Sequence, residues 1–501
     1  LIMSNSFMKN LIYLLFSTFF ILSCNKESIE KPNIILIVAD DLGWTDLSYM
    51  GSKYYETPNI DNLSESGVTF FNGYASSANC APSRASMMTG KYHPSHGIYT
   101  VSPSARGLDI TRKIIPIKNT ENLDLEFFTM AEMLKTEGYI NGHIGKWHLG
   151  HEGYYPKDQG FDINIGGWES GSPKGGYFSP YTNPNLESGP KGEYLTDRLT
   201  NEAINFIDEN KEKRFFLHLS YHSVHTPIQS KKEYSNYFKN KSSDENHNRP
   251  DYAGMIRSLD ENIGKVLAKI EELDLEENTL IIFTSDNGGI RAISNQFPLK
   301  AGKGSYYEGG IRVPLIFSWK GKLEAGKKSF ERVSNIDFYP TIKKIIGYKN
   351  KNLKLDGLDL NPIFNGKKLK DRSLFFHFPV YLEAYNVQKD DGKDPLFRTR
   401  PGSVIIKGDW KLHHYFEDNE LELYNLSDDV GESKDLSKIN EEITNRLYDD
   451  LENWRLDNNA PIPIEKNPKY NQKFVDSLIF LINQNKLSGR LKNNLLRNLN
   501  N

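Results

Sequence analysis

Two uncharged apolar runs, each followed at once by acidic side chains, constrain the fold of this chain more than any other feature. The first covers residues 33–39 (NIILIVA) and precedes two aspartates, and the second covers residues 279–284 (TLIIFT) and precedes the letters SDNGG. Short apolar runs without alternation are typical of strands that are buried on both faces of a sheet. In open α/β sheets, ligands bind beyond the carboxyl ends of such strands. The sequence therefore predicts a covered sheet with a polar site at one edge.

Helical and strand patterns alternate along the rest of this part of the chain, which indicates an α/β fold. The expected elements are helices at residues 125–136, 196–209 and 251–273, and strands at residues 214–221 and 313–319. We predict a large N-terminal domain, residues 33–348, with a central, mixed and mostly parallel sheet flanked by helices.

The pattern changes after a Lys- and Asn-rich stretch at residues 348–355. Shorter elements follow, and we expect strands at residues 373–378, 402–407, 410–415 and 420–424, a helix at 440–453 and a last helix from 474. Consecutive short strands favour an antiparallel sheet. Residues 349–501 are therefore predicted to form a smaller C-terminal α+β subdomain.

The first 24 residues resemble an export signal. Met8 opens a basic segment, and residues 11–22 are apolar and uncharged but too short to span a bilayer. The run ends at Cys24 in a pattern that resembles a bacterial lipoprotein box, in which the cysteine is acylated after cleavage. Residues 25–32 would then form a polar tether. We expect an exported protein of the bacterial cell envelope, periplasmic and lipid-anchored to a membrane; an ordinary signal peptide is the alternative.

Composition excludes several classes of protein. The 62 basic and 65 acidic side chains give a net charge of −3, so nucleic acid is not an expected partner. The only cysteines are Cys24 and Cys80. This count rules out a disulfide framework and a cysteine-rich metal site.

Four oxygen-bearing side chains follow the two apolar runs directly. They are Asp40, Asp41, Asp286 and Asn287. Three carboxylates and an amide suit a hard cation, Ca²⁺ or alternatively Mg²⁺, better than a soft metal. Turn residues at strand ends are the alternative interpretation, because Asp, Asn and Gly are common there.

A further motif decides between these interpretations. Residues 80–84 (CAPSR), followed by Thr89 and Gly90, match the signature C-x-P-S-R…T-G. With it, the chain resembles the formylglycine-dependent type I sulfatases of the alkaline-phosphatase-like superfamily, and among them the bacterial polysaccharide sulfatases. The further motifs occur in the family's order: residues 145–150 (GKWHLG), 222–227 (HSVHTP), 285–288 (SDNG), 302–304 (GKG) and 307–310 (YEGG).

This resemblance implies a covalent mechanism. A formylglycine-generating or sulfatase-maturating enzyme would oxidise Cys80 to formylglycine, whose hydrate attacks sulfur and later releases sulfate as the aldehyde re-forms. Cys80 would then be both the modified nucleophile and a ligand of Ca²⁺, beside the four oxygen ligands. Residues 83–88 read as a helix start, which favours an anion.

The resemblance also assigns roles to the cationic residues. Arg84 would stabilise the hydrate. Lys146, His148, His225 and Lys303 would surround the sulfate, with His225 and Lys303 as candidates for protonating the leaving oxygen and His148 as the base for hydrate collapse.

Substrate contacts are expected from loops and from the C-terminal subdomain. His151 and His222 flank the catalytic motifs. His377, Arg398 and Arg400 lie in segments that resemble C-terminal parts of bacterial polysaccharide sulfatases, where they could bind a uronate or a second sulfate. A structural salt bridge is the alternative for these residues.

The expected function is hydrolysis of sulfate monoesters on carbohydrates. Oligosaccharides from sulfated marine algal polysaccharides, such as ulvan or carrageenan, are the expected substrates, and glycosaminoglycans are the alternative. Two other readings remain open: a phosphatase or phosphonate hydrolase of the same superfamily, and a non-catalytic, glycan-binding surface lipoprotein. The first usually carries Ser or Thr as the nucleophile and two zinc ions, which residues 80–84 do not suggest.

Overall fold

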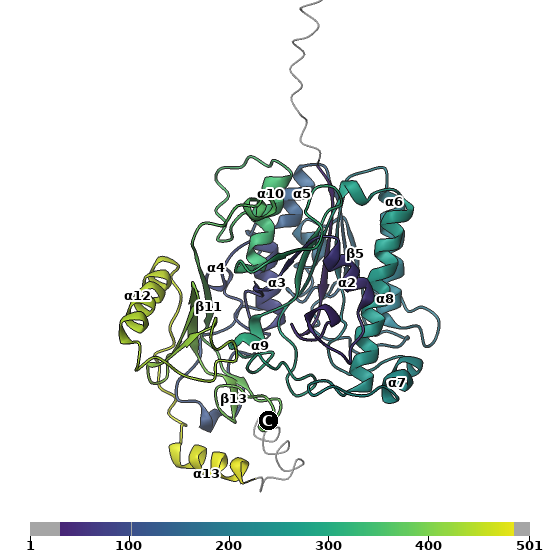
Figure 1. Ribbon diagram of the computed structural model, residues 1–501. Coiled ribbons are helices and arrows are strands. Elements are labelled where there is room, and N and C mark those ends of the chain that lie inside the picture. The colour runs from purple at the N-terminus through teal and green to yellow at the C-terminus, as the bar shows by residue number, and fades with distance from the viewer. Residues whose placement is uncertain (1–30, 102, 485–501) are drawn as a thin grey trace, which may run out of the picture. The chain divides into compact units, whose positions relative to one another are not determined.

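The computed structural model describes residues 31–101 and 103–484, and its large sheet has eight strands (Figure 1). In spatial order they are β5 (Ile163–Ile165), β4 (Ile140–Gly145), β6 (Phe215–Ser220), β1 (Asn33–Ala39), β7 (Thr279–Ser285), β8 (Leu315–Ser318), β2 (Val68–Phe70) and β9 (Lys327–Ser329). The first five run parallel, whereas β8 is antiparallel to both of its neighbours. This arrangement confirms the predicted mixed, mostly parallel sheet.

Helices cover both faces of this sheet (Figure 1). α6 (Leu195–Asn210) and α8 (Pro250–Glu272) pack on one face, and α3 (Cys80–Thr89), α5 (Met130–Thr136) and α10 (Phe338–Ile345) pack on the other. The helices that precede the C-terminal sheet also include α2 (Pro58–Glu65), α4 (His93–His96), α7 (Lys232–Lys239), α9 (Glu308–Ile311) and α11 (Asn361–Phe364), with 3-10 turns η1 (Ser48–Met50), η2 (Asp109–Thr111), η3 (Pro156–Gln159), η4 (Glu276–Asn278) and η5 (Asn335–Asp337). No helix among the described residues is both long and apolar enough to cross a bilayer.

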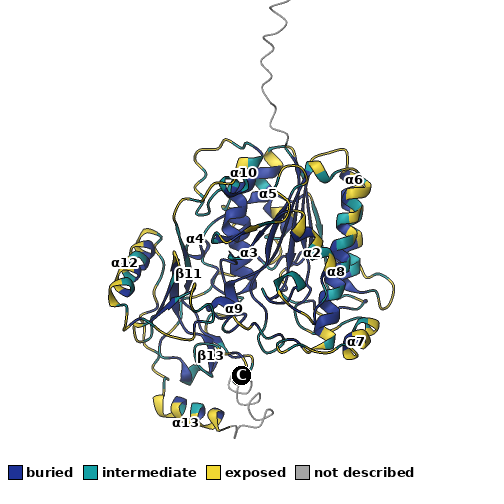
Figure 2. Cartoon of the chain, viewed as in Figure 1, coloured by how far each residue is buried: buried dark blue, intermediate teal, exposed yellow. Residues whose placement is uncertain are grey.

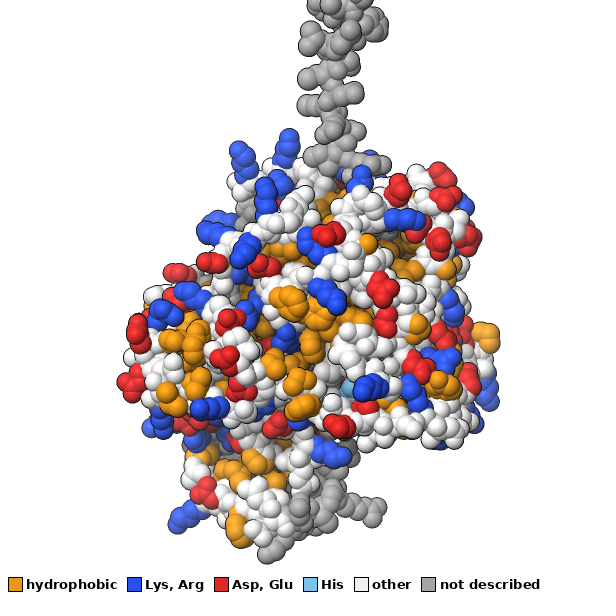
Figure 3. All heavy atoms as spheres, in the orientation of Figure 1, with side chains coloured by type: hydrophobic (Ala, Val, Ile, Leu, Met, Phe, Trp, Pro, Cys, Tyr) orange, Lys and Arg blue, Asp and Glu red, His pale blue; other side chains and the backbone are white. Residues whose placement is uncertain are grey.

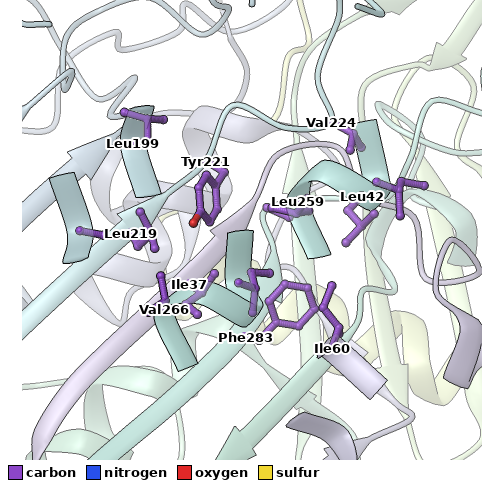
Figure 4. Packing of buried hydrophobic residues seen from close by; sticks show 14 of the residues in the cluster. Ile37, Leu42, Ile60, Leu199, Leu219, Tyr221, Val224, Leu259, Val266 and Phe283 are labelled. Carbon is purple, nitrogen blue, oxygen red and sulfur yellow. The ribbon is translucent and has the colours of Figure 1, made fainter. Parts of the chain in front are cut away.

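The central strand β1 shows why its sequence lacks alternation. Ile35 and Ile37 belong to the apolar cluster under α6 and α8, whereas Leu36 belongs to the cluster under α3 and α5. Figure 4 shows Ile37 and Phe283 of the neighbouring strand among side chains of the first cluster. Both faces of the strand are therefore removed from water, which is the main favourable term in its folding.

Two helices, α3 and α5, begin further from the expected residue than the other predicted helices do. α3 begins at Cys80 rather than at Ser83, because Pro82 fits the first turn, where its missing N–H needs no partner. α5 begins at Met130 rather than at residue 125, because Thr129 and Glu132 form a capping box. All ten residues of α3 are buried, as its dark blue ribbon in Figure 2 shows.

The C-terminal part contains the expected antiparallel sheet, in the order β11 (Ser373–Phe378), β14 (Gly402–Lys407), β15 (Trp410–Tyr415) and β16 (Glu420–Asn425). α12 (Glu441–Asp457) packs on β14 and β15. The other elements here are α13 (Gln472–Asn483) and a small sheet of β12 (Leu382–Glu383) with β13 (Phe397–Thr399). A second small sheet, β3 (Gly73–Tyr74) with β10 (Val333–Ser334), belongs to the N-terminal part. Both large sheets belong to one compact unit, so the division at residue 348 stays a prediction.

His377 lies within β11 and corrects one expectation. Its ring is fully buried, with Nδ1 2.8 Å from Ser403 Oγ and Nε2 3.0 Å from the Pro461 carbonyl oxygen. A carbonyl only accepts, so Nε2 carries the proton and Nδ1 accepts from the serine hydroxyl. Both ring nitrogens are thus occupied inside the subdomain, and His377 is a structural residue rather than a substrate ligand.

The burial of His377 makes a prediction about acid stability. Burial lowers the pKa of His377 from 6.5 to about 3, with the Pro461 carbonyl opposing. Between pH 6.5 and about 3, His377 is protonated in the unfolded chain but stays neutral in the folded chain. The stability contributed by neutral His377 is therefore fully present above pH 6.5 and decreases as the pH falls towards 3. Between pH 7 and pH 5, the wild type should lose about 2 kcal/mol more unfolding free energy than His377→Gln in urea titrations.

The matched control for this measurement is His151→Gln, because that side chain is already 56% exposed in the folded protein. Equal losses in the wild type and in His377→Gln would contradict the assignment of His377 as a buried, neutral group.

Candidate active site

Residues at the ends of β1 and β7 meet as the sequence predicts. The backbone N–H of Asp286 donates to the Ala39 carbonyl (3.1 Å), and that of Asp41 donates to Asp286 Oδ1 (3.2 Å). Asp41 has a φ of 62°, a left-handed conformation that Asp tolerates better than most residues. The parallel register of the two strands thereby brings Asp40, Asp41, Asp286 and Asn287 together, and all four are buried.

Cys80 faces this cluster from the first position of α3. Its Sγ lies 3.7 Å from Asp40 Oδ1 and 3.9 Å from Asp41 Oδ1, and the residue is 1% exposed. Burial raises the pKa of the Cys80 thiol to about 12, although Lys146 and Lys303 oppose the shift. The thiolate is the reactive form of cysteine, so this residue is unsuited to act as a thiol nucleophile at neutral pH.

Three cationic side chains neutralise the three carboxylates. Lys146 Nζ lies 2.7 Å from Asp40 Oδ2, and Lys303 Nζ lies 2.7 Å from Asp41 Oδ1. Both lysines are buried. Burial alone would lower the pKa of Lys303, but the Asp41 carboxylate, with smaller contributions from other nearby acidic groups, raises it well above its ordinary value, so the ammonium stays charged.

Arg84 pairs with the third carboxylate. Its Nε donates to Asp286 Oδ2 at 2.8 Å, while Nη1 donates to Ser220 Oγ (2.5 Å) and to the Lys146 carbonyl (3.2 Å). Burial raises the pKa of Asp286, but Arg84 and then Lys146 lower it, and together they hold that pKa below its usual range. Arg84 therefore connects α3 to the ends of β4, β6 and β7.

The donor set fits a hard cation. Ligand atoms of Asp40, Asp41, Cys80 and His225 all lie within 4.8 Å of one another. The amide Nδ2 of Asn287 donates to Asp41 Oδ1 (2.8 Å), which leaves the buried Oδ1 of Asn287 without a partner. A buried oxygen without a donor is costly unless something binds it, and clustered oxygen atoms are the ligands that Ca²⁺ prefers.

Burial and the neighbouring cations shift the pKa values of Asp40 and Asp41 in opposite directions. Burial raises the pKa of Asp40, with Lys146 opposing. Burial also raises the pKa of Asp41, but Lys303 and then His225 lower it further, and the net pKa lies below the usual range. Asp41 is therefore ionised at neutral pH, as a metal ligand must be.

Histidines complete the rim of the cluster. His225 Nε2 lies 3.6 Å from Asp41 Oδ2, and its Nδ1 lies 2.6 Å from the Thr226 carbonyl oxygen. Because that carbonyl accepts, Nδ1 carries the proton and a neutral His225 has a free Nε2 lone pair. Burial, followed by Lys303, lowers the pKa of His225 to about 3.

Two more histidines have a buried, unpartnered Nδ1. They are His222, which is buried as a whole, and His148, which is half-buried with only its Nδ1 fully removed from solvent. Burial, followed by Lys146, lowers the pKa of each ring well below its ordinary value, so both are neutral. His148 borders the cleft described next, whereas His222 lies behind the cluster, beside α6 and Trp168.

A cleft of about 230 Å³ opens beside the cluster. Ala81 and His148 form its inner end, and His151 lies on its outer wall. The His151 ring nitrogens lie 3.2 Å from Glu169 Oε2 and 3.7 Å from Glu121 Oε2. His151 thus lines the same cleft as His148. Glu121 and Glu169 also line this cleft and were not anticipated, because no motif marks them in the loops they occupy.

The two C-terminal arginines have different surroundings. Arg398 Nη1 donates to the Lys303 carbonyl at 2.8 Å, which places Arg398 next to the site. Arg400 instead forms ion pairs with Asp394 and with Glu417, the latter at 3.0 Å, inside the subdomain. The structural alternative is therefore correct for Arg400, because carboxylates of its own chain occupy its guanidinium.

The sequence comparisons agree with this geometry. Residues 32–348 match the family model described as "Sulfatase", and residues 302–457 match one described as "N-sulphoglucosamine sulphohydrolase, C-terminal". A protein described as "Sulfatase" from Formosa agariphila is 33% identical over 520 residues, which cover 88% of this chain and 91% of that relative. The N-acetylgalactosamine-6-sulfatase of Mus musculus is 32% identical, over 70% of this chain and 69% of the relative.

Comparison with solved structures gives the same result. The crystal structure of Ps i-CgsB in complex with k-i-k-neocarrahexaose has a TM-score of 0.70 and 31% identity, covering 90% of this chain and 97% of that one. With its family model, its relatives and its fold in agreement, this chain belongs to the sulfatase family and is a sulfuric ester hydrolase.

Proposed function

We propose that this enzyme removes sulfate from carbohydrates, with Cys80 as the precursor of formylglycine and Ca²⁺ held at the strand ends. One observation carries the proposal: Cys80 begins a buried helix with its Sγ 3.7 and 3.9 Å from two strand-end carboxylates, within a cluster of cations. Formylglycine, once formed, supplies a hydrate oxygen as the nucleophile. Ca²⁺, when bound by Asp40, Asp41, Asp286 and Asn287, supplies an electrophilic centre for anionic oxygens.

The chain's own residues would bind the sulfate and hold it for in-line attack. The N-terminus of α3 and the ammonium groups of Lys146 and Lys303 make the site attractive to an anion. Arg84, fixed by Asp286, orients the side chain at position 80 from the next turn of the same helix. Charges held in place before the substrate arrives favour a transition state in which charge moves onto the leaving oxygen.

Proton transfer would involve three of these residues. Lys303 is protonated at neutral pH and can donate to the leaving oxygen. His225 has a low pKa in the substrate-free protein, so it becomes a donor only when an adjacent anion raises that pKa. His148, neutral and with an unpartnered Nδ1 at the cleft, is placed to accept a proton in the second half of the reaction.

The carbohydrate class is supported by the relatives rather than by the catalytic cluster. One relative is named for N-acetylgalactosamine 6-sulfate, and one similar structure contains a neocarrahexaose. We propose oligosaccharides from a sulfated polysaccharide of the carrageenan or ulvan type as substrates. Glycosaminoglycan fragments are the second candidate class.

Processing and location complete the proposal. A formylglycine-generating or sulfatase-maturating enzyme would act on Cys80. Cys24 lies outside the described residues, and we propose that it carries a lipid that anchors the exported, periplasmic enzyme to a membrane. The first strand begins at Asn33, which leaves residues 25–32 as the proposed tether.

A phosphatase or phosphonate hydrolase is less well supported by the site. Within residues 31–101 and 103–484, the one group suited to a metal consists of Asp40, Asp41, Cys80 and His225. A two-zinc enzyme needs a second set of nitrogen and oxygen ligands beside the first. A non-catalytic glycan-binding protein would have no need for this buried, charge-balanced cluster.

Replacing Cys80 tests the nucleophile. Cys80→Ala should abolish sulfate release from 4-nitrophenyl sulfate, because alanine cannot be oxidised to an aldehyde, while the thermal unfolding midpoint stays near that of the wild type. Peptide mass spectrometry of active wild-type protein should show an aldehyde in place of the thiol at position 80. Retained turnover by the variant would refute the mechanism.

The choice between sulfatase and phosphatase chemistry has a direct measurement. Purified enzyme should release sulfate from 4-nitrophenyl sulfate at a kcat/KM at least about a hundredfold higher than that for phosphate release from 4-nitrophenyl phosphate, since the site offers a single hard-metal set. A reversed preference would favour the phosphatase alternative.

The metal site is tested by binding. Removal of Asn287 Oδ1 deletes one ligand and also the amide that orients Asp41, so Asn287→Ala should weaken Ca²⁺ binding by at least about tenfold in calorimetry. Asn240→Ala, at the exposed end of α7, serves as the control. Unchanged affinity in Asn287→Ala would exclude this residue as a ligand.

A further inference from the structure

An exposed tyrosine lies next to the catalytic loop without any role in the chemistry described above. Tyr385 follows β12 and is 41% exposed. One face of its ring lies on the guanidinium of Arg398, whose Cζ is 3.5 Å from the ring centroid. Asp390 accepts hydrogen bonds from the backbone N–H groups of Tyr385 and Asn386, which fixes the segment. The other ring face is therefore held ready for a ligand.

Arg398 links this tyrosine to the catalytic site. Its Nη1 donates to the Lys303 carbonyl and its Nε to the Glu383 carbonyl, both at 2.8 Å. The Arg398 guanidinium lies so close to the backbone of Gly304 that a Cβ atom at Gly304 would be 2.3 Å from Arg398 Nη1. Arg398 is buried and its Nη2 has no partner. Only one guanidinium therefore separates Tyr385 from the backbone of Lys303, and Figure 1 shows β13, which carries Arg398, near α9 of the catalytic domain.

Arg106 supplies a second cation at the same place. Its Nη2 lies 2.8 Å from Glu383 Oε1, and its side chain is 19% exposed. Burial lowers the pKa of Arg106, but Glu383, followed by Tyr385 and Cys80, raises it above its ordinary value. All three groups are thus within electrostatic range of this guanidinium. The carboxylates of Glu383 and Asp390 lie beside the two arginines, and Arg106 is the arginine of the pair that keeps part of its side chain exposed.

We propose that Tyr385 and Arg106 form a subsite for the sugar that neighbours the sulfated sugar, with its pyranose ring on the free face of Tyr385 and its carboxylate or sulfate on Arg106. The inference rests on the proposed carbohydrate function and narrows it to anionic oligosaccharides. Aromatic rings bind apolar faces at little entropic cost when they are already fixed, and guanidinium groups match oxyanions in a bidentate geometry.

The face of the molecule drawn in Figure 3 has no extended basic patch that would select a polyanion. Basic and acidic side chains alternate over the face drawn in Figure 3, and the net charge of the chain is −3. Recognition of an anionic neighbour therefore has to come from local groups such as Arg106, not from a general positive field.

The test compares two kinds of substrate in the mature, metal-loaded enzyme. One is 4-nitrophenyl sulfate, which has no neighbouring sugar, and the other is the best-cleaved member of a panel of carrageenan, fucoidan and chondroitin sulfate oligosaccharides of increasing length. Tyr385→Ala should lower the ratio of kcat/KM for the oligosaccharide to that for the aryl sulfate by about tenfold, mainly through KM. Tyr385→Phe, which keeps the ring, should lower it less than about twofold.

Arg106→Gln should lower the same ratio about tenfold for a substrate whose neighbouring sugar is anionic, and less than about twofold when that sugar is neutral. The matched control is Tyr237→Ala, because Tyr237 is also exposed (47%) and stacked on an arginine, Arg257, but belongs to α7. It should leave the ratio unchanged.

Three outcomes would overturn the inference: a ratio within twofold of the wild type in Tyr385→Ala, an equal loss in Tyr237→Ala, or a wild type that cleaves sulfated monosaccharides as well as any longer substrate. In each case sulfate release by the wild type continues, so the proposed function would stand. An enzyme in which Cys80 is shown to be formylglycine and which releases sulfate from neither substrate would instead refute the proposed function itself.

Discussion

A balance of buried charge at the carboxyl ends of β1 and β7 is the interaction on which the rest of the structure depends. Three carboxylates and three cationic side chains lie there, none more than 4% exposed. Removing one partner of such a pair leaves an uncompensated buried charge, which typically destabilises a protein by about 3–5 kcal/mol. The balance explains why helix α3, the β4 end and the loop of Lys303 must all converge on one point. It also leaves the site ready to exchange internal ion pairs for a metal and an anionic substrate.

The C-terminal sheet holds one side of this balance in place. Lys411, fully buried in β15, lies 2.9 Å from Glu308 Oε1 and 2.9 Å from Glu432 Oε1. Glu308 begins α9, directly after the loop that carries Lys303, and Arg398 holds the same loop from β13. The C-terminal residues therefore support the site, because the buried Lys411 and Arg398 contact the segment that carries Lys303, whose ammonium group pairs with Asp41.

Local sequence was informative where a residue's role follows from its own segment. The apolar runs predicted β1 and β7, and the polar residues after them meet because parallel strands share one edge. The start of α3 at Cys80 was missed, since a proline in the first turn reads as a break until the cap is seen. His377 and Arg400 were misjudged for a different reason. Their partners, Ser403, Pro461, Asp394 and Glu417, come from other segments, and no pattern around either residue reveals those contacts.

The burial of Cys80 limits the time at which the proposed modification could occur. With 1% exposure and a place inside a fully buried helix, the thiol is closed to any other protein once α3 has packed. Oxidation at this position would therefore have to precede folding of the segment around α3. A molecule that folds before Cys80 is oxidised would retain the unmodified thiol and would stay inactive. The fraction of active enzyme in a preparation would then depend on the rate of Cys80 oxidation relative to the rate of folding, and not on the stability of the folded protein.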